Sequence, residues 1–112
     1  MVYHANYLKY FERARTEWLR SLDCDAQTLQ REHGVAFTVR RMEIDFLKPA
    51  RMDDMVQAGV LLAQVKRASF MLEQEARVNG EPIARARVQV ACVACTGFAP
   101  CAIPDFLLEK LG

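Results

Sequence analysis

Residues 2–22 read VYHANYLKYFERARTEWLRSL, and their apolar side chains recur every three or four positions. The stripe consists of Tyr7, Leu8, Phe11, Ala14, Trp18, Leu19 and Leu22. This spacing is typical of one face of an α-helix that packs against a core. Arg13 and Glu17 lie off the stripe, four residues apart, within reach of an ion pair. The stretch predicts one long helix.

Four β-prone runs follow this helix, at residues 35–46, 55–65, 69–78 and 83–95. In the first run the alternation of apolar residues slips at Arg40-Arg41, which predicts a β-bulge. Gly59 weakens the second run or marks a bend in it. Asn79-Gly80 between the last two runs favours a type I′ hairpin turn. The order predicts an α+β fold, in which a curved antiparallel sheet wraps around one long central helix.

The last strand carries only small side chains on one face, namely Ala84, Ala86, Val88, Val90, Cys92 and Ala94. A row of small residues lets a helix approach closely, so we expect this strand beneath the central helix. Arg85, Arg87 and Gln89 alternate with this row, which places them on the opposite face, toward solvent or another subunit.

Two shorter helices are expected outside this frame. Asp25 can cap a helix at residues 26–33, and Gly34 supplies its left-handed stop. Pro104 suits the first turn of a C-terminal helix at residues 105–111.

The chain of 112 residues is long enough for one domain, residues 1–112. A net charge of +1 gives no electrostatic argument for a nucleic-acid partner. The sequence shows no apolar run of membrane-spanning length and no basic leader, so we expect a cytoplasmic protein. A single sheet leaves unpaired backbone groups at its edge strands, and these are usually covered by assembly. We therefore expect a homodimer or homotetramer.

Cys24, Cys92, Cys95 and Cys101 are expected to be buried or half-buried free thiols. Cys92 and Cys95 form a CxxC at the end of a strand pattern, where residues three apart point to opposite faces. This geometry is poor for one zinc ion, so no metal site is predicted. A redox CxxC at the start of a helix is the alternative.

Tyr3, His4, Asn6 and Tyr7 crowd the start of the long helix. The first turn of a helix presents unpaired backbone N–H groups and a positive dipole end, which suit a developing oxyanion. A histidine there can orient a substrate, donate a hydrogen bond, or act as acid or base. Alternatively, His4 and Asn6 only cap the helix and the tyrosines fill space.

The run VYHANYLKYFERARTEWLRSL resembles the signature of the hotdog-fold acyl-CoA thioesterases, specifically the 4-hydroxybenzoyl-CoA thioesterase family and its YbgC-type branch. The similarity continues through MEIDFLKPARMDDMV, the strand with Phe70 and Gln74, and RVQVACVAC, so it covers nearly the whole chain. The resemblance implies the hotdog fold and hydrolysis of an acyl-CoA thioester, with coenzyme A as part of the substrate and no further cofactor.

In this branch the substrate carbonyl lies at the start of the long helix, and an aspartate just upstream of the Tyr-His pair is the nucleophile or general base. Tyr3 and His4 match the end of that catalytic motif, and Asn6 and Tyr7 match the substrate-binding start of the helix. The aspartate itself would precede Met1. Glu12, Glu17, Asp45, Asp53 and Asp54 are expected in helix, strand-end and turn roles instead.

The turn with Lys66, Arg67 and Ser69 matches a place where the family sets basic and hydroxyl groups against the nucleotide phosphates of coenzyme A. Basic side chains suit phosphate oxygens by charge and by number of donors. A solvated hairpin turn is the alternative. Phe46, Pro49 and Phe70 line the acyl tunnel or belong to the core.

Three functions follow from the resemblance. The first is a thioesterase for short-chain or aromatic acyl-CoA. The second is an inactive hotdog domain that binds acyl-CoA, acyl carrier protein or another protein. The third is a hotdog dehydratase, against which the YHANY context argues.

Overall fold

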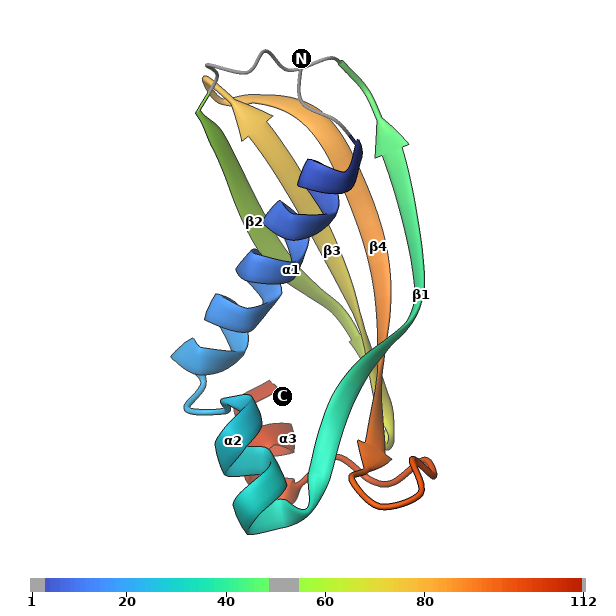
Figure 1. Ribbon diagram of the computed structural model, residues 1–112. Helices are drawn as coiled ribbons and strands as arrows, with labels where there is room; N and C mark the ends of the chain where they lie inside the picture. Colours follow the sequence, from blue (N-terminus) through green and yellow to red (C-terminus); the bar gives the residue numbers. More distant parts are fainter. Residues whose placement is uncertain (1–3, 49–54, 112) are drawn as a thin grey trace.

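The computed structural model describes residues 4–48 and 55–111, as one sheet with one long helix (Figure 1). Its helices are α1 (His4–Ser21), α2 (Ala26–Thr28), the π-helical turn η1 (Leu29–His33) and α3 (Asp105–Leu111). Its strands are β1 (Val35–Phe46), β2 (Val56–Val65), β3 (Ser69–Val78) and β4 (Glu81–Ala94).

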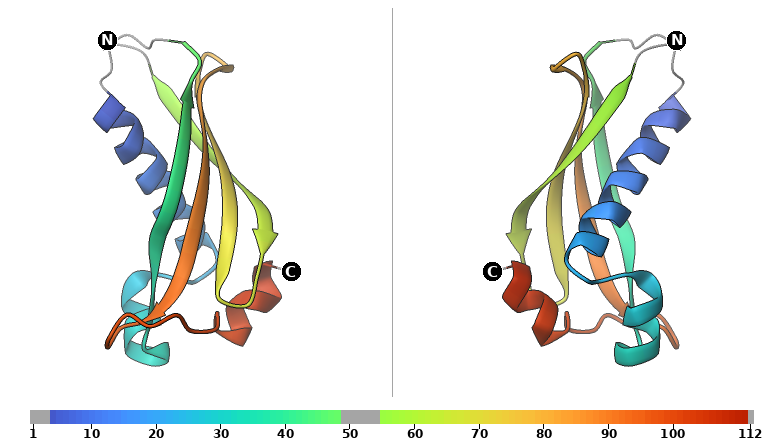
Figure 2. Two further views of the ribbon diagram at one scale, coloured as in Figure 1. Left: turned by 90° about the vertical axis from the view of Figure 1, so that its right-hand side faces the viewer. Right: turned by 90° about the vertical axis from the view of Figure 1, so that its left-hand side faces the viewer.

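All strand pairs are antiparallel, in the order β1-β4-β3-β2. Asn79 and Gly80 join β3 to β4 with φ of 53° and 79°, which is the left-handed pair that a type I′ turn requires. The sheet is curved, and α1 crosses one of its faces obliquely (Figure 2). The α+β architecture predicted from the sequence is therefore confirmed.

The core lies between α1 and the facing side of the sheet. Tyr7 and Phe11 contribute from the helix, and Phe70, Leu72 and Val88 contribute from the two central strands. Burial of these side chains is the main favourable term that holds helix and sheet together.

The predicted place of Leu8 on the apolar stripe is wrong, because 47% of its surface is exposed. It lies one residue from buried Tyr7, about 100° around the helix, so it falls at the margin of the buried face. Tyr10 packs against the core in its place.

The small residues of β4 are buried as predicted, with Ala84, Ala86 and Val88 at 3% exposure or less. However, α1 approaches β2 and β3 more closely than β4, so the placement of β4 directly beneath the helix is wrong. The bulky side chains of Phe11 and Phe70 share the same core as these alanines.

The short helices begin and end where the sequence indicates. Asp25 caps α2 by accepting a hydrogen bond of 2.7 Å from the Thr28 backbone N–H, and Gly34 ends η1 with φ of 66°. The single α-helix expected at residues 26–33 is instead α2 continued by the π-helical turn η1. Pro104 accepts backbone hydrogen bonds from Leu107 and Leu108 in α3, as its first-turn position suggests.

Register shifts interrupt the regular pairing of two strands, β1 and β2. The register between β1 and β4 shifts between Val39 and Arg41, which confirms the predicted bulge. Gly59 pairs regularly with Glu75, and the register shift in β2 falls between Leu62 and Gln64, so no register shift marks Gly59. A glycine permits a distortion, but side-chain packing along the strand decides where it occurs.

The four thiols are free, with Cys24 and Cys92 buried and Cys95 and Cys101 half-buried, as predicted. Cys92 lies within β4 and Cys95 in the turn after it, so the CxxC does not begin a helix. Within residues 4–48 and 55–111, no cluster of three histidine, cysteine or acidic side chains could hold a metal ion. The helices in these two ranges are too short or too polar to span a membrane.

Candidate functional site

The start of α1 is the first part of the candidate site. His4 is the first residue of the helix, Asn6 lies in its first turn, and this turn contains no acidic side chain. The first turn of a helix leaves backbone N–H groups without partners inside the helix, so this end carries a positive potential that suits a bound oxygen. Tyr3 and the side chains of His4 and Asn6 lie outside the described part of the structure.

Tyr7 joins this end of α1 to the end of β1. Its side chain is only 3% exposed, and its ring meets the Phe46 ring edge to face, with 5.4 Å between centroids and 67° between planes. This arrangement is the favourable one for two aromatic rings. The contact fixes the end of β1 beside the first turns of the helix.

An apolar surface lies beside this contact. Phe46 is 43% exposed and Leu47 is 46% exposed, although both are large apolar residues. The backbone N–H groups of Leu47 and Lys48 both donate to the Ile83 carbonyl, which holds this strand end against β4. The exposure of Leu47 is not predictable from the sequence, because a leucine at a strand end carries no signal of exposure. The exposed part of Phe46 lies beside the start of α1 and is available there to an apolar group.

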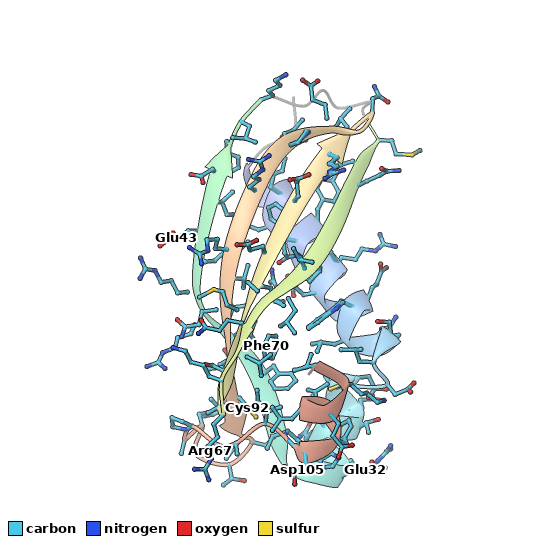
Figure 3. All side chains as sticks on the ribbon, turned by 180° about the vertical axis from the view of Figure 1, so that it is seen from behind. Glu32, Glu43, Arg67, Phe70, Cys92 and Asp105 are labelled. Atoms are coloured by element: carbon cyan, nitrogen blue, oxygen red, sulfur yellow. The ribbon has the colours of Figure 1, made fainter. Side chains whose placement is uncertain are left out.

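Lys66, Arg67 and Ser69 lie in and after the β2–β3 turn, at the opposite end of the sheet from the start of α1 (Figure 1). Figure 3 places Arg67 at the same end as Asp105 of α3. The Lys66 N–H donates to the Ser69 carbonyl at 2.7 Å, and the Arg67 carbonyl accepts from Ile103 at 2.8 Å. The turn is thus anchored through its backbone, with the Lys66 and Arg67 side chains exposed.

One chain does not bring the two predicted groups of site residues together. They lie toward opposite ends of β3, whose ten residues span about 33 Å when fully extended. His4 and Tyr7 therefore form one candidate site, and Lys66, Arg67 and Ser69 form another surface at the far end of the sheet.

A buried polar contact lies between these two ends, where β3 meets the middle of α1. The Gln74 side chain is 2% exposed, and its Nε2 donates to the Phe11 carbonyl oxygen at 2.9 Å. The Arg15 Nη1 donates to the Gln74 Oε1 at 2.8 Å. Partial burial lowers the pKa of Arg15. Helix and sheet are thus held in one register by polar as well as apolar contacts.

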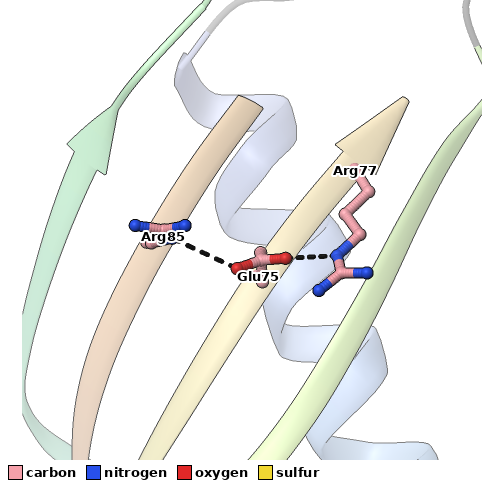
Figure 4. A network of polar contacts seen from close by, with 3 residues as sticks. All are labelled: Glu75, Arg77 and Arg85. Carbon is pink, nitrogen blue, oxygen red and sulfur yellow. Dashed lines mark hydrogen bonds and ion pairs between the residues drawn. The ribbon is translucent and has the colours of Figure 1, made fainter. Parts of the chain in front are cut away.

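The face of the sheet turned away from α1 carries rows of alternating charge. Glu75 accepts from both Arg77 and Arg85, the latter at 3.1 Å (Figure 4). The Arg77 hydrogen bond is the main reason that the pKa of Glu75 is lowered. Arg87 lies 4.0 Å from Glu73 in the next row.

This charged face contains a hollow of about 750 Å³. Its walls include Glu43, Asp45, Glu73, Arg77, Arg85 and Arg87. It is lined by four carboxylates and three arginines, and the arginines already pair with two of the carboxylates, Glu73 and Glu75. We therefore assign no catalytic role to it.

The acidic residues that lie in the described ranges have the helix and strand positions that the sequence predicts. Glu17 pairs with Arg13 at 3.3 Å on the exposed side of α1, which confirms the predicted ion pair. Glu12 is exposed on the same helix, and Asp45 is exposed on β1 opposite Arg85. Asp53 and Asp54, like Pro49, fall outside the described ranges.

Comparison with known proteins identifies the family. Residues 1–111 match the model of the thioesterase-like superfamily. The YbgC acyl-CoA thioesterase of Haemophilus influenzae is 41% identical over 104 residues, which cover 93% of this chain and 76% of the relative.

Solved structures agree with this match. A probable thioesterase from Bartonella henselae superimposes with a TM-score of 0.86 at 31% identity, over 92% of this chain and 85% of the other. A Thermus thermophilus thioesterase complexed with coenzyme A and Zn gives a TM-score of 0.79 at 30% identity, over 98% of this chain and 78% of the other. The fold described above is thus the hotdog fold, and the chain belongs to the thioesterase-like superfamily, with YbgC acyl-CoA thioesterases among its relatives.

Proposed function

We propose that this protein hydrolyses short-chain or aromatic acyl-CoA thioesters to the free acid and coenzyme A. The observation that carries the proposal is the start of α1, which combines an oxyanion-binding helix end with an adjoining apolar surface. Membership of a thioesterase superfamily supports this use of the geometry.

The thioester carbonyl oxygen would accept hydrogen bonds from backbone N–H groups of the first helical turn. These donors and the helix dipole stabilise the oxyanion that forms when an oxygen nucleophile attacks the carbonyl carbon. Collapse of the intermediate breaks the carbon–sulfur bond and releases the thiolate of coenzyme A. We assign Tyr3 and His4 to orienting the thioester and transferring protons, and Asn6 to holding the substrate.

A carboxylate is still needed to attack the carbonyl or to activate water. We follow the family resemblance in assigning this role to an aspartate upstream of Tyr3. The described acidic residues discussed above have other positions in the fold.

The acyl group would lie on the apolar surface made by Phe46 and Leu47, with Tyr7 as its inner wall. An aromatic or short acyl group matches a surface of two or three side chains better than a long chain does. The edge-to-face contact between Tyr7 and Phe46 keeps this wall in place.

We assign the phosphates of coenzyme A to Lys66, Arg67 and Ser69. Since this turn is a sheet length from the start of α1 in the same chain, a second copy must bring it to the thioester. This requirement supports the proposal of a homodimer or homotetramer. The same carbonyl chemistry would also accept a thioester carried by acyl carrier protein. Four free thiols suit a reducing compartment, which supports a cytoplasmic location.

The test is release of free thiol from a panel of acetyl-, butyryl-, benzoyl- and palmitoyl-CoA. The assay compares the 112-residue chain with a form extended upstream by the encoding DNA. We expect turnover of the short or aromatic thioesters by the form that contains the upstream aspartate. Tight binding of acyl-CoA by both forms without thiol release would show instead a binding module, and turnover only of palmitoyl-CoA would refute the proposed substrate class.

A further inference from the structure

Two thiols that differ in their burial lie close together near the end of β4. The Cys92 Sγ lies 3.7 Å from the Cys101 Sγ. Cys92 is fully buried within β4, whereas Cys101 is half-buried in the segment that leads to α3. The hydrolysis proposed above uses neither residue.

The backbone already holds these cysteines in a position that suits a disulfide. Val93 and Pro100 form an antiparallel bridge, which places Cys92 and Cys101 directly opposite each other. The Cys101 N–H donates to the Cys92 carbonyl at 3.0 Å, and the Ala94 N–H donates to Ala99 at 2.9 Å on the other side of the bridge. Directly opposite residues of such a pair have Cα atoms about 4.5–5.5 Å apart, within the range of about 4.4–6.8 Å that disulfides use.

We propose that Cys92 and Cys101 are an oxidation site, at which a peroxide forms a reversible intramolecular disulfide. The inference rests on this local geometry and is independent of the thioesterase activity. Closing the bond requires the sulfur atoms to move from 3.7 Å to about 2.05 Å, which rotation of the side chains on a fixed backbone can supply.

The chemistry proceeds in two steps. The Cys101 sulfur, which is the more accessible, attacks one peroxide oxygen; the O–O bond breaks, leaving a sulfenic acid and water. The Cys92 sulfur then attacks the Cys101 sulfur, the S–O bond breaks, and the leaving hydroxide takes the Cys92 proton to become water. The two sulfurs together lose two electrons, and the peroxide gains them.

The order of the steps follows from burial. Desolvation raises the pKa of Cys92 to about 12, with smaller contributions from its hydrogen bond with Cys101 and from neighbouring thiols. Cys92 is therefore a poor first target for a peroxide, because the thiolate is the reactive form. It is a suitable resolving thiol, because it already contacts the sulfur that would be oxidised first.

The bond would fasten the C-terminal segment to the sheet. Ile103, two residues beyond Cys101, is buried and donates its N–H to Arg67, while the Cys92 N–H donates to Ala68. Both ends of the disulfide thus adjoin residues that hold the β2–β3 turn. Oxidation would therefore restrain both this turn and the chain segment that leads to α3.

The experiment treats the reduced 112-residue protein with hydrogen peroxide, unfolds it in guanidinium chloride, blocks the remaining thiols with N-ethylmaleimide and measures the intact mass. We expect a loss of about 2 Da from the protein, blocking of only two cysteines, and full reversal by dithiothreitol. Chymotryptic cleavage after the exposed Phe98 should give two peptides that remain joined until reduction.

Variants separate the proposed pair from the neighbouring CxxC. Cys95→Ser should still form the linked peptides, whereas Cys101→Ser and Cys92→Ala should not. The oxidised parent should melt about 5–10 °C above the reduced parent, since the bond restricts the unfolded chain. The proposal is overturned if Cys95→Ser abolishes the link, if all four thiols remain open to blocking, or if Cys101 is over-oxidised while Cys92 is still blocked.

Discussion

The side-chain amide of Gln74 donates a hydrogen bond of 2.9 Å to the backbone carbonyl of Phe11, in the middle of α1. Phe11 is fully buried, so this bond forms in a dry region where an unpaired amide would be costly. Arg15 completes the contact from one turn further along the helix. The position of α1 along the sheet, and hence the place of its first turn, depends on this contact.

Replacing Gln74 by leucine should lower the free energy of unfolding by about 1–3 kcal/mol, because Arg15 loses its acceptor in a partly buried site. Urea unfolding measures the change. Gln57→Leu is the matched control, since Gln57 is exposed on β2 and should change stability by no more than about 0.5 kcal/mol. Equal losses in the two variants would contradict the importance of the buried amide.

Enlarging Ala86 should destabilise the core. Ala86 is 3% exposed on the helix-facing side of β4, and Ala86→Leu should cost about 1–3 kcal/mol through overpacking. Thermal unfolding provides the measurement. Ala63→Leu, on an exposed position of β2, adds the same side chain without this cost. A melting temperature equal to that of the parent would show that the β4 face has spare volume.

The cap at Asp25 predicts a pH dependence. Its hydrogen bonds from Thr28 lower the pKa of Asp25 in the folded state. The carboxylate therefore stabilises the fold above the unfolded-state pKa of about 3.9, and this contribution is lost as the pH falls through the lower folded-state pKa. Asp25→Ala should lower the melting temperature by a few degrees at pH 7.

Asp25→Asn provides the control for this titration. Asparagine caps a helix about as well as aspartate, so its melting temperature at pH 7 should match the parent. As the pH falls below about 4, the parent should lose more stability than this variant. Parallel melting curves over that range would remove Asp25 from the acid response.

The proposed role of His4 predicts a selective loss of turnover. In the form extended upstream, His4→Ala should reduce the rate of thiol release by about 100-fold or more if His4 transfers protons. Its effect on the melting temperature should be small, because His4 is the terminal residue of α1. His33→Ala is the matched control, since His33 stacks on Phe106 at the other end of the molecule. Unchanged hydrolysis by the His4 variant would exclude it from the mechanism.

The phosphate-binding proposal predicts an effect on substrate affinity alone. The double variant Lys66→Ala/Arg67→Ala should raise KM for acyl-CoA about two- to tenfold at low salt and leave kcat unchanged. The increase should shrink as ionic strength rises. Arg31→Ala removes a charge from exposed η1 and should leave KM unaltered. A KM that does not respond to the double variant would place the phosphates elsewhere.

The parts of the fold that the sequence predicts are those governed by local periodicity and turn chemistry. The spacing of Tyr7, Phe11 and Trp18 is sufficient for α1, and Asn79-Gly80 is sufficient for the hairpin, because each signal lies within a short stretch of chain. The bulge near Arg41 is predictable for the same reason, since a break in alternation is itself local.

Contacts between distant segments are not predictable in this way. The pairing of Cys92 with Cys101 depends on how the chain returns after the turn at Gly97, and the pattern there suggests only a CxxC. Likewise, no local pattern indicates that the Lys66–Arg67 turn and His4 lie at opposite ends of the sheet. Such distances are set by the lengths and directions of whole strands.

The strand order also constrains how the chain can assemble. The β3–β4 hairpin closes through Asn79 and Gly80 alone, so it forms with little loss of chain entropy. In contrast, β1 pairs with β4 although β2 and β3 lie between them in the sequence, and Val35 is opposite Ala94. Formation of this long-range pairing is therefore expected to limit the folding rate. The start of α1 acquires its neighbour Phe46 only when that late step is complete, so the proposed catalytic surface is among the last parts of the molecule to take shape.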